Sequence, residues 1–318
     1  MTLAPASPGE SPASPSGGAV AARTPLAVTS ALVQVARPRQ WIKNLLVFGA
    51  PGAAGILLQP HTIVLTFGAF VAFCLAASGT YALNDVMDAD ADRRHPRKCR
   101  RPVASGLLSP VAALSFGAVL MAATPSDAAA VAGGHFAAVV AVYLVITCAY
   151  TLRLKHEPIV DLACVSAGFV LRAIGGGVAT GVVLSPWFLI VASFGSLLVV
   201  TGKRSAEVAA LGEAGTQHRK ALAAYPLTLL RSIRVIATGI TAIAYCLWAF
   251  GRSTQRDLGH HLFWVELSVL PFVLALLLLE LRFERGEGGA PEDIALGDRT
   301  LQVVGAIWLA LVAVAVYA

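Results

Sequence analysis

A cluster of aspartates at positions 84–92 carries the strongest chemical signal in the sequence, which there reads Asn84-Asp85-Val-Met-Asp88-Ala-Asp90-Ala-Asp92. At 3.6 residues per turn, Asp85, Asp88 and Asp92 are expected on one face of a helix. Asn84 lies on the shoulder of that face, and Asp90 points the other way. Like charges at this spacing repel each other, so a compensating cation is expected. Mg²⁺ takes one or two carboxylates together with substrate phosphates, and the cluster predicts a metal–diphosphate site.

The alternative interpretation of this cluster is a solvated helix end, neutralised by the arginines at 93, 94 and 97. Its position favours the metal site, because the cluster closes a long apolar run and stands beside a basic loop. The interpretation that we carry forward assigns catalysis to Asn84, Asp85, Asp88 and Asp92, and metal binding to the three aspartates Asp85, Asp88 and Asp92.

Polar residues at the ends of other apolar runs are candidate ligands for substrate phosphates. Arginine offers bidentate geometry to a phosphate and lysine offers a point charge. The structural alternative is an interfacial anchor for the lysines and a buried pairing for the arginine that lies inside a run. The candidate substrate-binding residues are Lys43, Asn44, Tyr81, Arg101, Lys155, Asp161, Arg172, Lys203 and Arg204.

The elements that must position these residues are membrane-spanning helices. Of the 318 residues, 57% are hydrophobic and only 13% are charged, and the mean hydropathy is +0.72. Soluble domains are about one-quarter charged, so an ordinary soluble protein is excluded. A transmembrane β-barrel is excluded as well, because its segments are short and alternating rather than long and apolar.

Nine apolar runs approach the roughly 20 residues that a bilayer core requires. They predict an all-α bundle of nine transmembrane helices, with residues 1–30, rich in Ala, Pro, Ser and Gly, as a disordered cytoplasmic tail. Residues 31–318 then form a single domain. The runs are Trp41–Leu58, Thr62–Leu83, Val103–Ala123, Ala128–Leu152, Ile159–Gly181, Trp187–Thr201, Leu230–Phe250, Leu262–Leu281 and Leu301–Tyr317.

Basic residues indicate the orientation of the bundle. If the runs alternate across the membrane, 21 Lys and Arg side chains fall on one side and two on the other, with Arg172 inside a run. The positive-inside rule then places the N-terminus and the aspartate cluster in the cytoplasm, and nine crossings place the C-terminus outside. The net charge of +6 reflects this bias and does not call for a nucleic-acid partner. The expected location is the inner (plasma) membrane.

The motif Asn84-Asp85-x-x-Asp88-x-x-x-Asp92 resembles the N-D-x-x-D-x-x-x-D signature of UbiA-type intramembrane prenyltransferases, a nine-helix family. The order of the spans is similar over essentially the whole chain after the tail. Further stretches resemble the actinobacterial decaprenyl-phosphate phosphoribosyltransferase branch of this family. They are Arg37-Pro-Arg-Gln-Trp-Ile-Lys43-Asn44, Arg101-Pro-Val-Ala-Ser-Gly106, Leu154-Lys155-His156, Leu171-Arg172-Ala-Ile-Gly-Gly-Gly177, Gly202-Lys203-Arg204-Ser-Ala-Glu207 and Pro291-Glu-Asp-Ile-Ala-Leu-Gly-Asp298-Arg299.

This resemblance implies a cytoplasm-facing, Mg²⁺-dependent site, with Mn²⁺ as a substitute. The implied donor is 5-phosphoribosyl 1-diphosphate and the implied acceptor is decaprenyl phosphate, both handled at the membrane lipid surface. The product, decaprenyl-phosphoryl 5-phosphoribose, would serve arabinan synthesis for a cell wall. The resemblance leaves a homo-oligomer open. One departure is informative: the family's second motif is usually D-x-x-x-D, whereas Asp161 is followed four residues later by Val165.

Two other functions compete with this interpretation. A prenyltransferase that moves a polyprenyl group from its diphosphate to an aromatic or haem-like acceptor shares the same aspartates, but the single Asp161 argues against it. A lipid or solute transporter normally carries ionisable residues within its spans. Here the spans hold few such residues besides Arg172 and Glu266, which disfavours transport.

Overall fold

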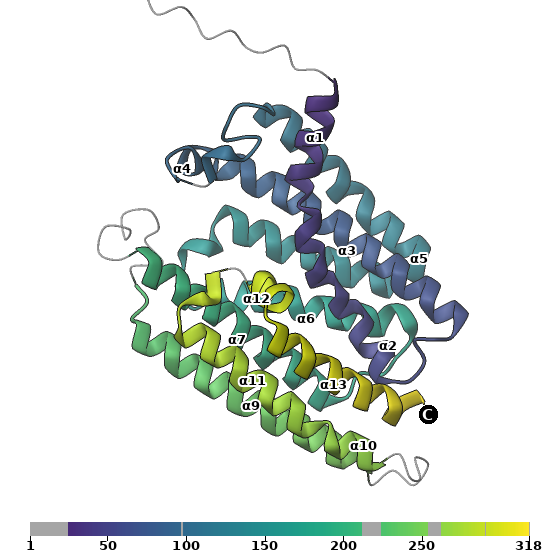
Figure 1. Ribbon diagram of the computed structural model, residues 1–318. Coiled ribbons are helices and arrows are strands. Elements are labelled where there is room, and N and C mark those ends of the chain that lie inside the picture. The colour runs from purple at the N-terminus through teal and green to yellow at the C-terminus, as the bar shows by residue number, and fades with distance from the viewer. Residues whose placement is uncertain (1–24, 97, 212–223, 254–261, 290, 318) are drawn as a thin grey trace, which may run out of the picture.

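Helices are the only regular secondary structure in the part of the chain that the computed structural model describes, residues 25–96, 98–211, 224–253, 262–289 and 291–317. Figure 1 shows the helices packed side by side, with their axes mostly inclined in one direction. The elements are α1 (Pro25–Ala36), η1 (Pro38–Phe48), α2 (Gly49–Ala53), α3 (Pro60–Met87), α4 (Ala89–Arg93), η2 (Lys98–Arg100), α5 (Pro110–Leu152), η3 (Leu154–His156), α6 (Val160–Thr180), α7 (Pro186–Leu211), α9 (Leu227–Ser253), α10 (Leu262–Leu267), α11 (Val269–Glu284), η6 (Glu287–Gly289), α12 (Pro291–Gly297) and α13 (Arg299–Tyr317).

Seven helical segments in the described chain are long and apolar enough to cross a membrane. They include every expected span after the first, with two of the expected spans joined in α5 and the short α10 joined to α11. Many large apolar side chains on these helices are exposed, such as Val111 at 75% and Leu270 at 68%. In water such a surface would be unfavourable, but it suits contact with lipid. The chain is a multi-pass membrane protein.

Helix α5 joins the two spans that the sequence predicted at 103–123 and 128–152. At 1.5 Å per residue its 43 residues would extend about 65 Å if straight, twice the thickness of a bilayer core. The helix bends instead at Ala132 and Gly133, whose backbone angles leave the helical region, and Gly133 has a φ of 80°. Glycine tolerates this angle without a steric penalty. The predicted break between these spans therefore lies inside one bent helix, several residues later than expected.

The first apolar segment departs most from the sequence expectation. Instead of one α-helix over 41–58, the chain forms the 3₁₀ helix η1 and the single short turn α2, preceded by α1. Helix α1 begins at Pro25, so residues 25–30 of the expected disordered tail are helical; residues 1–24 lie outside the described chain. A 3₁₀ helix of 11 residues is unusually long, and such stretches mark strain or function.

The end of the chain closes the bundle against its beginning. Helices α3, α5, α6, α7 and α9 each contact the next in this order, and α11 contacts α9 and α13. The hydroxyl of Tyr317 in α13 accepts a hydrogen bond of 3.3 Å from the backbone N–H of Leu57, which lies just beyond α2. It donates a second one, also of 3.3 Å, to the carbonyl oxygen of Gly52 within α2. In Figure 1 the yellow C-terminal helix accordingly ends beside α2.

Three consecutive glycines in α6 allow η1 and other neighbours to approach its backbone. A Cβ atom at Gly176 would lie 1.9 Å from the carbonyl oxygen of Val47 in η1. At Gly175 it would meet the ring of Phe73 at 2.5 Å, and at Gly177 the side chain of Leu184 at 2.6 Å. The sequence interpretation of this triplet as a point of close helix approach is consistent with these distances.

We expect Gly176→Ala to lower the free energy of unfolding by about 1–3 kcal/mol, the usual cost of overpacking a filled site. The backbone of η1 must move, because the atom that the new methyl group meets is a carbonyl oxygen. Thermal unfolding in detergent measures the loss. Gly239→Ala in α9 is the control, since nothing lies within 4 Å of its Cβ position; equal losses in both variants would contradict the account.

Candidate active site

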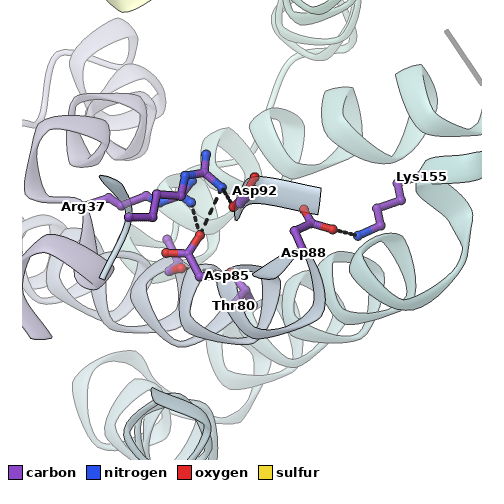
Figure 2. A network of polar contacts seen from close by, with 8 residues as sticks. Arg37, Thr80, Asp85, Asp88, Asp92 and Lys155 are labelled. Atoms are coloured by element: carbon purple, nitrogen blue, oxygen red, sulfur yellow. Dashed lines mark hydrogen bonds and ion pairs between the residues drawn. The ribbon is translucent and has the colours of Figure 1, made fainter. Parts of the chain in front are cut away.

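Asp85 is a buried carboxylate that two arginines neutralise. Its side chain is 2% exposed near the end of α3 and forms an ion pair with Arg37, which lies just before η1. Arg101, from the loop after η2, places Nη1 3.2 Å from Asp85 Oδ1 and 2.6 Å from Asp92 Oδ2. Figure 2 shows Asp85 and Asp92 turned toward these guanidinium groups. A buried charge requires such partners, so Asp85 depends on two loops distant in sequence.

The three aspartates do not share one helix face as the sequence predicted. Helix α3 ends at Met87, and Asp88 leaves the helical region with φ −96° and ψ 1° before α4 begins at Ala89. The carboxylate of Asp88 turns away from Asp85 and forms an ion pair with Lys155, whose Nζ lies 2.5 Å from Asp88 Oδ1 (Figure 2). Like charges at helical spacing destabilise a helix, and this break separates them.

Arg37 pairs with the aspartate cluster, although the sequence did not single it out as a candidate. It adopts a left-handed backbone conformation with φ 52° and ψ 59°, which is uncommon for a non-glycine residue and costs about 1–3 kcal/mol. Its guanidinium carbon lies 5.0 Å from the centre of the Tyr81 ring, in a cation–π contact. Two signals were available in the sequence. Arg37 opens the stretch Arg37–Asn44 that resembles the phosphoribosyltransferase branch, and it precedes Pro38, where a residue avoids the right-handed helical region.

The residues around Arg101 suit a divalent cation, although no three His, Cys, Asp or Glu side chains within the described ranges are grouped to hold one. The predicted three-carboxylate cage is therefore not preassembled, because Asp88 pairs with Lys155 instead. One nitrogen of Arg101 already contacts both Asp85 and Asp92, so a single cation reaches two carboxylates at this point. Two carboxylates plus phosphate oxygens form a normal Mg²⁺ site.

Asp161 forms a separate buried cluster at the start of α6. Its carboxylate, 1% exposed, accepts an ion pair of 2.6 Å from Arg204 and a hydrogen bond from the Tyr225 hydroxyl. The same hydroxyl accepts a hydrogen bond from the backbone N–H of Ile159, whose φ is 67°. Arg204 forms a second ion pair with Glu207. Burial, and secondly the hydrogen bond to Asp161, raise the pKa of Tyr225 above its usual value. Both oxygens of Asp161 are engaged by protein groups.

Arg172 lies in a third cluster and is 5% exposed. Its Nε donates to Asn44 Oδ1 at 2.6 Å, and its two terminal nitrogens donate to the Gly168 carbonyl oxygen at 2.6 Å and the Tyr143 hydroxyl at 2.9 Å. Asn44 also contacts Cys74 at 3.1 Å. These contacts match the structural alternative, a buried arginine held by neutral groups, and they tie α6 to η1. The predicted substrate-binding roles of Arg172 and Asn44 stay predictions.

Of the remaining candidates, two are half-buried and one is exposed. Asn84 is half-buried one residue before Asp85, and Lys43 is half-buried in η1. Lys203 is exposed near the cytoplasmic end expected for α7, next to the buried Arg204. The structure thus brings Arg37, Tyr81, Arg101 and Lys155 together with Asp85, Asp88 and Asp92. Asp90 points away and pairs with Arg93, while Asp161 with Arg204 and Arg172 with Asn44 form their own clusters.

We expect Tyr225→Phe to lower the free energy of unfolding by about 1–3 kcal/mol near neutral pH, because Asp161 loses a donor and the Ile159 N–H loses its acceptor. The folded state raises the pKa of Tyr225, so its hydroxyl stabilises the protein below the unfolded pKa. The difference between wild type and variant should therefore shrink above about pH 10.

Thermal unfolding in detergent across this pH range measures the difference. Tyr317→Phe is the control, because the Tyr317 hydroxyl also makes two hydrogen bonds, but at an exposed position and to the uncharged backbone of Leu57 and Gly52. A pH-independent difference, or an equal loss in the Tyr317 variant, would contradict this assignment.

Comparison with known proteins agrees with the geometry. The sequence pattern of the UbiA prenyltransferase family matches residues 45–293. The decaprenyl-phosphate phosphoribosyltransferase of Corynebacterium glutamicum is 40% identical over 297 residues, which cover 92% of this chain and 89% of the relative. The protein of the same name from Mycobacterium tuberculosis H37Rv is 40% identical over 301 residues, covering 93% and 98%.

A solved structure supports the fold independently. A UbiA homologue from Archaeoglobus fulgidus, bound to GPP and Mg²⁺, superposes with a TM-score of 0.66 and covers 90% of this chain and 99% of its own. Its sequence identity is 16%, so this likeness concerns the fold alone. With the family pattern and the relatives above, it leads to one conclusion: the chain belongs to the UbiA prenyltransferase family.

Proposed function

We propose that the protein transfers 5-phosphoribose from 5-phosphoribosyl 1-diphosphate to decaprenyl phosphate, releasing diphosphate. The observation that carries this proposal is 40% identity, over more than nine-tenths of the chain, to relatives named decaprenyl-phosphate phosphoribosyltransferase. The site is compatible with such substrates, because Arg37, Arg101 and Lys155 surround carboxylates that suit a metal-bound diphosphate. The product would supply arabinan synthesis for a cell wall.

The metal would lie at Asp85 and Asp92, where one cationic nitrogen now contacts both carboxylates. A bound Mg²⁺, or Mn²⁺ in its place, supplies Lewis-acid stabilisation of the charge that grows on the leaving diphosphate. Asp88 completes the acidic set once Lys155 turns toward a phosphate. Asn84, one residue before Asp85, would hydrogen-bond the ribose or a phosphate oxygen.

The reaction requires no strong general base from the protein. A phosphate monoester has a second pKa of about 6 and is largely ionised near neutral pH. An oxygen of the lipid phosphate forms a bond to the anomeric carbon, the bond from that carbon to the diphosphate oxygen breaks, and the electron pair leaves with diphosphate. Arg37, Arg101 and Lys155 hold phosphate oxygens in line for this displacement, which proceeds with inversion.

We also propose that the chain crosses a plasma membrane nine times with this site facing the cytoplasm. The two arms of α5 and the broken segment α1–η1–α2 bring the number of crossings from seven to nine. The strong bias of Lys and Arg toward one set of loops supports an orientation with the N-terminus inside and the C-terminus outside. This orientation exposes the site to a water-soluble donor, while the bundle admits the acceptor from the bilayer.

The function is tested with purified protein in detergent, labelled 5-phosphoribosyl 1-diphosphate, decaprenyl phosphate and Mg²⁺. We expect label to enter the organic phase, EDTA to stop this, and Asp85→Asn to reduce the rate about a hundredfold or more, since it weakens the metal site. Asp90→Asn is the matched control, because Asp90 is exposed and paired with Arg93. Consumption of a prenyl diphosphate with an aromatic acceptor, and no phosphoribosyl transfer, would refute the proposal.

The ion pairs also predict that metal and diphosphate bind cooperatively, each strengthening the binding of the other. A metal ion alone must displace Arg37, Arg101 or Lys155 from the carboxylates and leave these cations beside it, whereas diphosphate neutralises them. Thermal unfolding in detergent should therefore show a small increase in Tm with Mg²⁺ alone and a larger increase with Mg²⁺ and diphosphate than the two separate increases combined. A full increase with Mg²⁺ alone would contradict this exchange of cations.

A further inference from the structure

A cleft opens beside the aspartate cluster, between the junction of α1 with η1 and the short helix α12. Its volume is about 400 Å³, within the range of small-molecule sites. Gln34, Arg37, Arg39, Gln40 and Asp293 provide its polar lining, and Pro38 completes it. Two arginines against one aspartate give the lining a net positive charge, which makes this cleft suitable for an anion.

Arg37 connects this cleft with the aspartate cluster. One side of its guanidinium pairs with Asp85, while the residue also lines the cleft. Its left-handed backbone and its contact with the Tyr81 ring hold the side chain at this boundary. Backbone strain of this kind persists only where the surrounding structure enforces it, and it concentrates at ligand-binding sites. Two anionic groups of one complex can therefore lie on either side of Arg37.

Arg39 holds a carboxylate at the mouth of the cleft. Its Nη2 lies 2.6 Å from Asp293 Oδ1, and the two side chains are 72% and 53% exposed. Exposed pairs of this kind contribute little to stability, so an incoming anion can replace Asp293 at small cost. A phosphate is the natural replacement, because guanidinium groups bind carboxylates and phosphates in the same bidentate geometry.

We propose that this cleft binds a phosphate monoester between Arg37 and Arg39, next to the diphosphate site. The inference rests on the proposed function, in which both substrates carry such a group: the 5-phosphate of the donor and the phosphate of the acceptor lipid. Arg39 is then a substrate-binding residue, and Asp293 is a carboxylate that occupies its guanidinium until the phosphate arrives.

The test measures binding of two probes to the purified full chain in detergent with EDTA, so that it does not depend on transfer. Ribose 5-phosphate represents the donor and farnesyl phosphate represents the acceptor, with ribose and farnesol as unphosphorylated controls. We expect Arg39→Gln to weaken binding of at least one phosphate probe about tenfold, the effect of losing a charge-assisted hydrogen bond. Asp293→Asn should leave that binding unchanged or tighter, because it removes the competing carboxylate.

Arg93→Gln is the matched control, since Arg93 also forms an exposed pair with an aspartate but lies outside the cleft. An effect of Arg39→Gln on ribose 5-phosphate assigns the cleft to the donor, and an effect on farnesyl phosphate assigns it to the acceptor. Equal weakening by Arg39→Gln and Asp293→Asn would show that the pair is only a structural latch and overturn the proposal. Unchanged binding of both probes in Arg39→Gln, or equal binding of the unphosphorylated controls, would also overturn it.

If labelled phosphoribose is not transferred but Arg39-dependent phosphate binding persists, the proposed reaction fails and the phosphate site remains. If transfer occurs and binding is independent of Arg39, the reaction stands and the site fails. In the transfer assay, Arg39→Gln should raise KM about tenfold for the substrate whose phosphate the cleft binds, and kcat should be nearly unchanged. The reason is that the lost contact holds the substrate and does not touch the reacting atoms.

Discussion

Several carboxylates at the end of an apolar helix cannot stay close together without cations, and this constraint organises the whole polar face of the protein. Asp85, Asp88 and Asp92 draw Arg37 from the start of η1, Arg101 from the loop after η2, and Lys155 from the turn before α6. Three segments far apart in the sequence are thereby fixed around one point. The same electrostatic requirement explains why the helix breaks at Asp88, and it underlies the proposal that a metal and a polyanion bind here together.

Contacts deeper in the bundle, in which Arg172 binds only neutral groups, also support the polar face. Arg172 binds the side chain of Asn44 in η1, and the glycine at position 176 lets the backbone of Val47 approach α6. These contacts hold the irregular η1 segment in place, and Arg37 is its first flanking residue. An arginine inside a membrane span is costly unless its donors are satisfied, and here three of its nitrogens donate hydrogen bonds. The position of Arg37 against Asp85 thus depends on packing within the bundle.

Much of this arrangement was predictable from the sequence, because long apolar runs identify membrane-spanning helices and aspartates at their ends identify a polar site. The pairing of Lys155 and Arg101 with the aspartates was not, since ion pairs between distant loops leave no local pattern. The 3₁₀ conformation of η1 was also missed, because its apolar composition fits an ordinary helix. Arg37 illustrates the limit most clearly. The sequence shows that it opens a stretch resembling the family branch and that a proline follows it, but tertiary contacts set its left-handed backbone and its pairing with Asp85.

We expect substrate and metal to replace the ion pairs at the aspartates. A cryo-EM structure of the protein with Mn²⁺ and 5-phosphoribosyl 1-diphosphate would show this exchange. We predict metal density between Asp85 and Asp92, with Arg37 and Arg101 turned from these carboxylates to phosphate oxygens. Metal bound at Asp161, or a bound donor beside ion pairs that remain as they are in the present structure, would contradict the account.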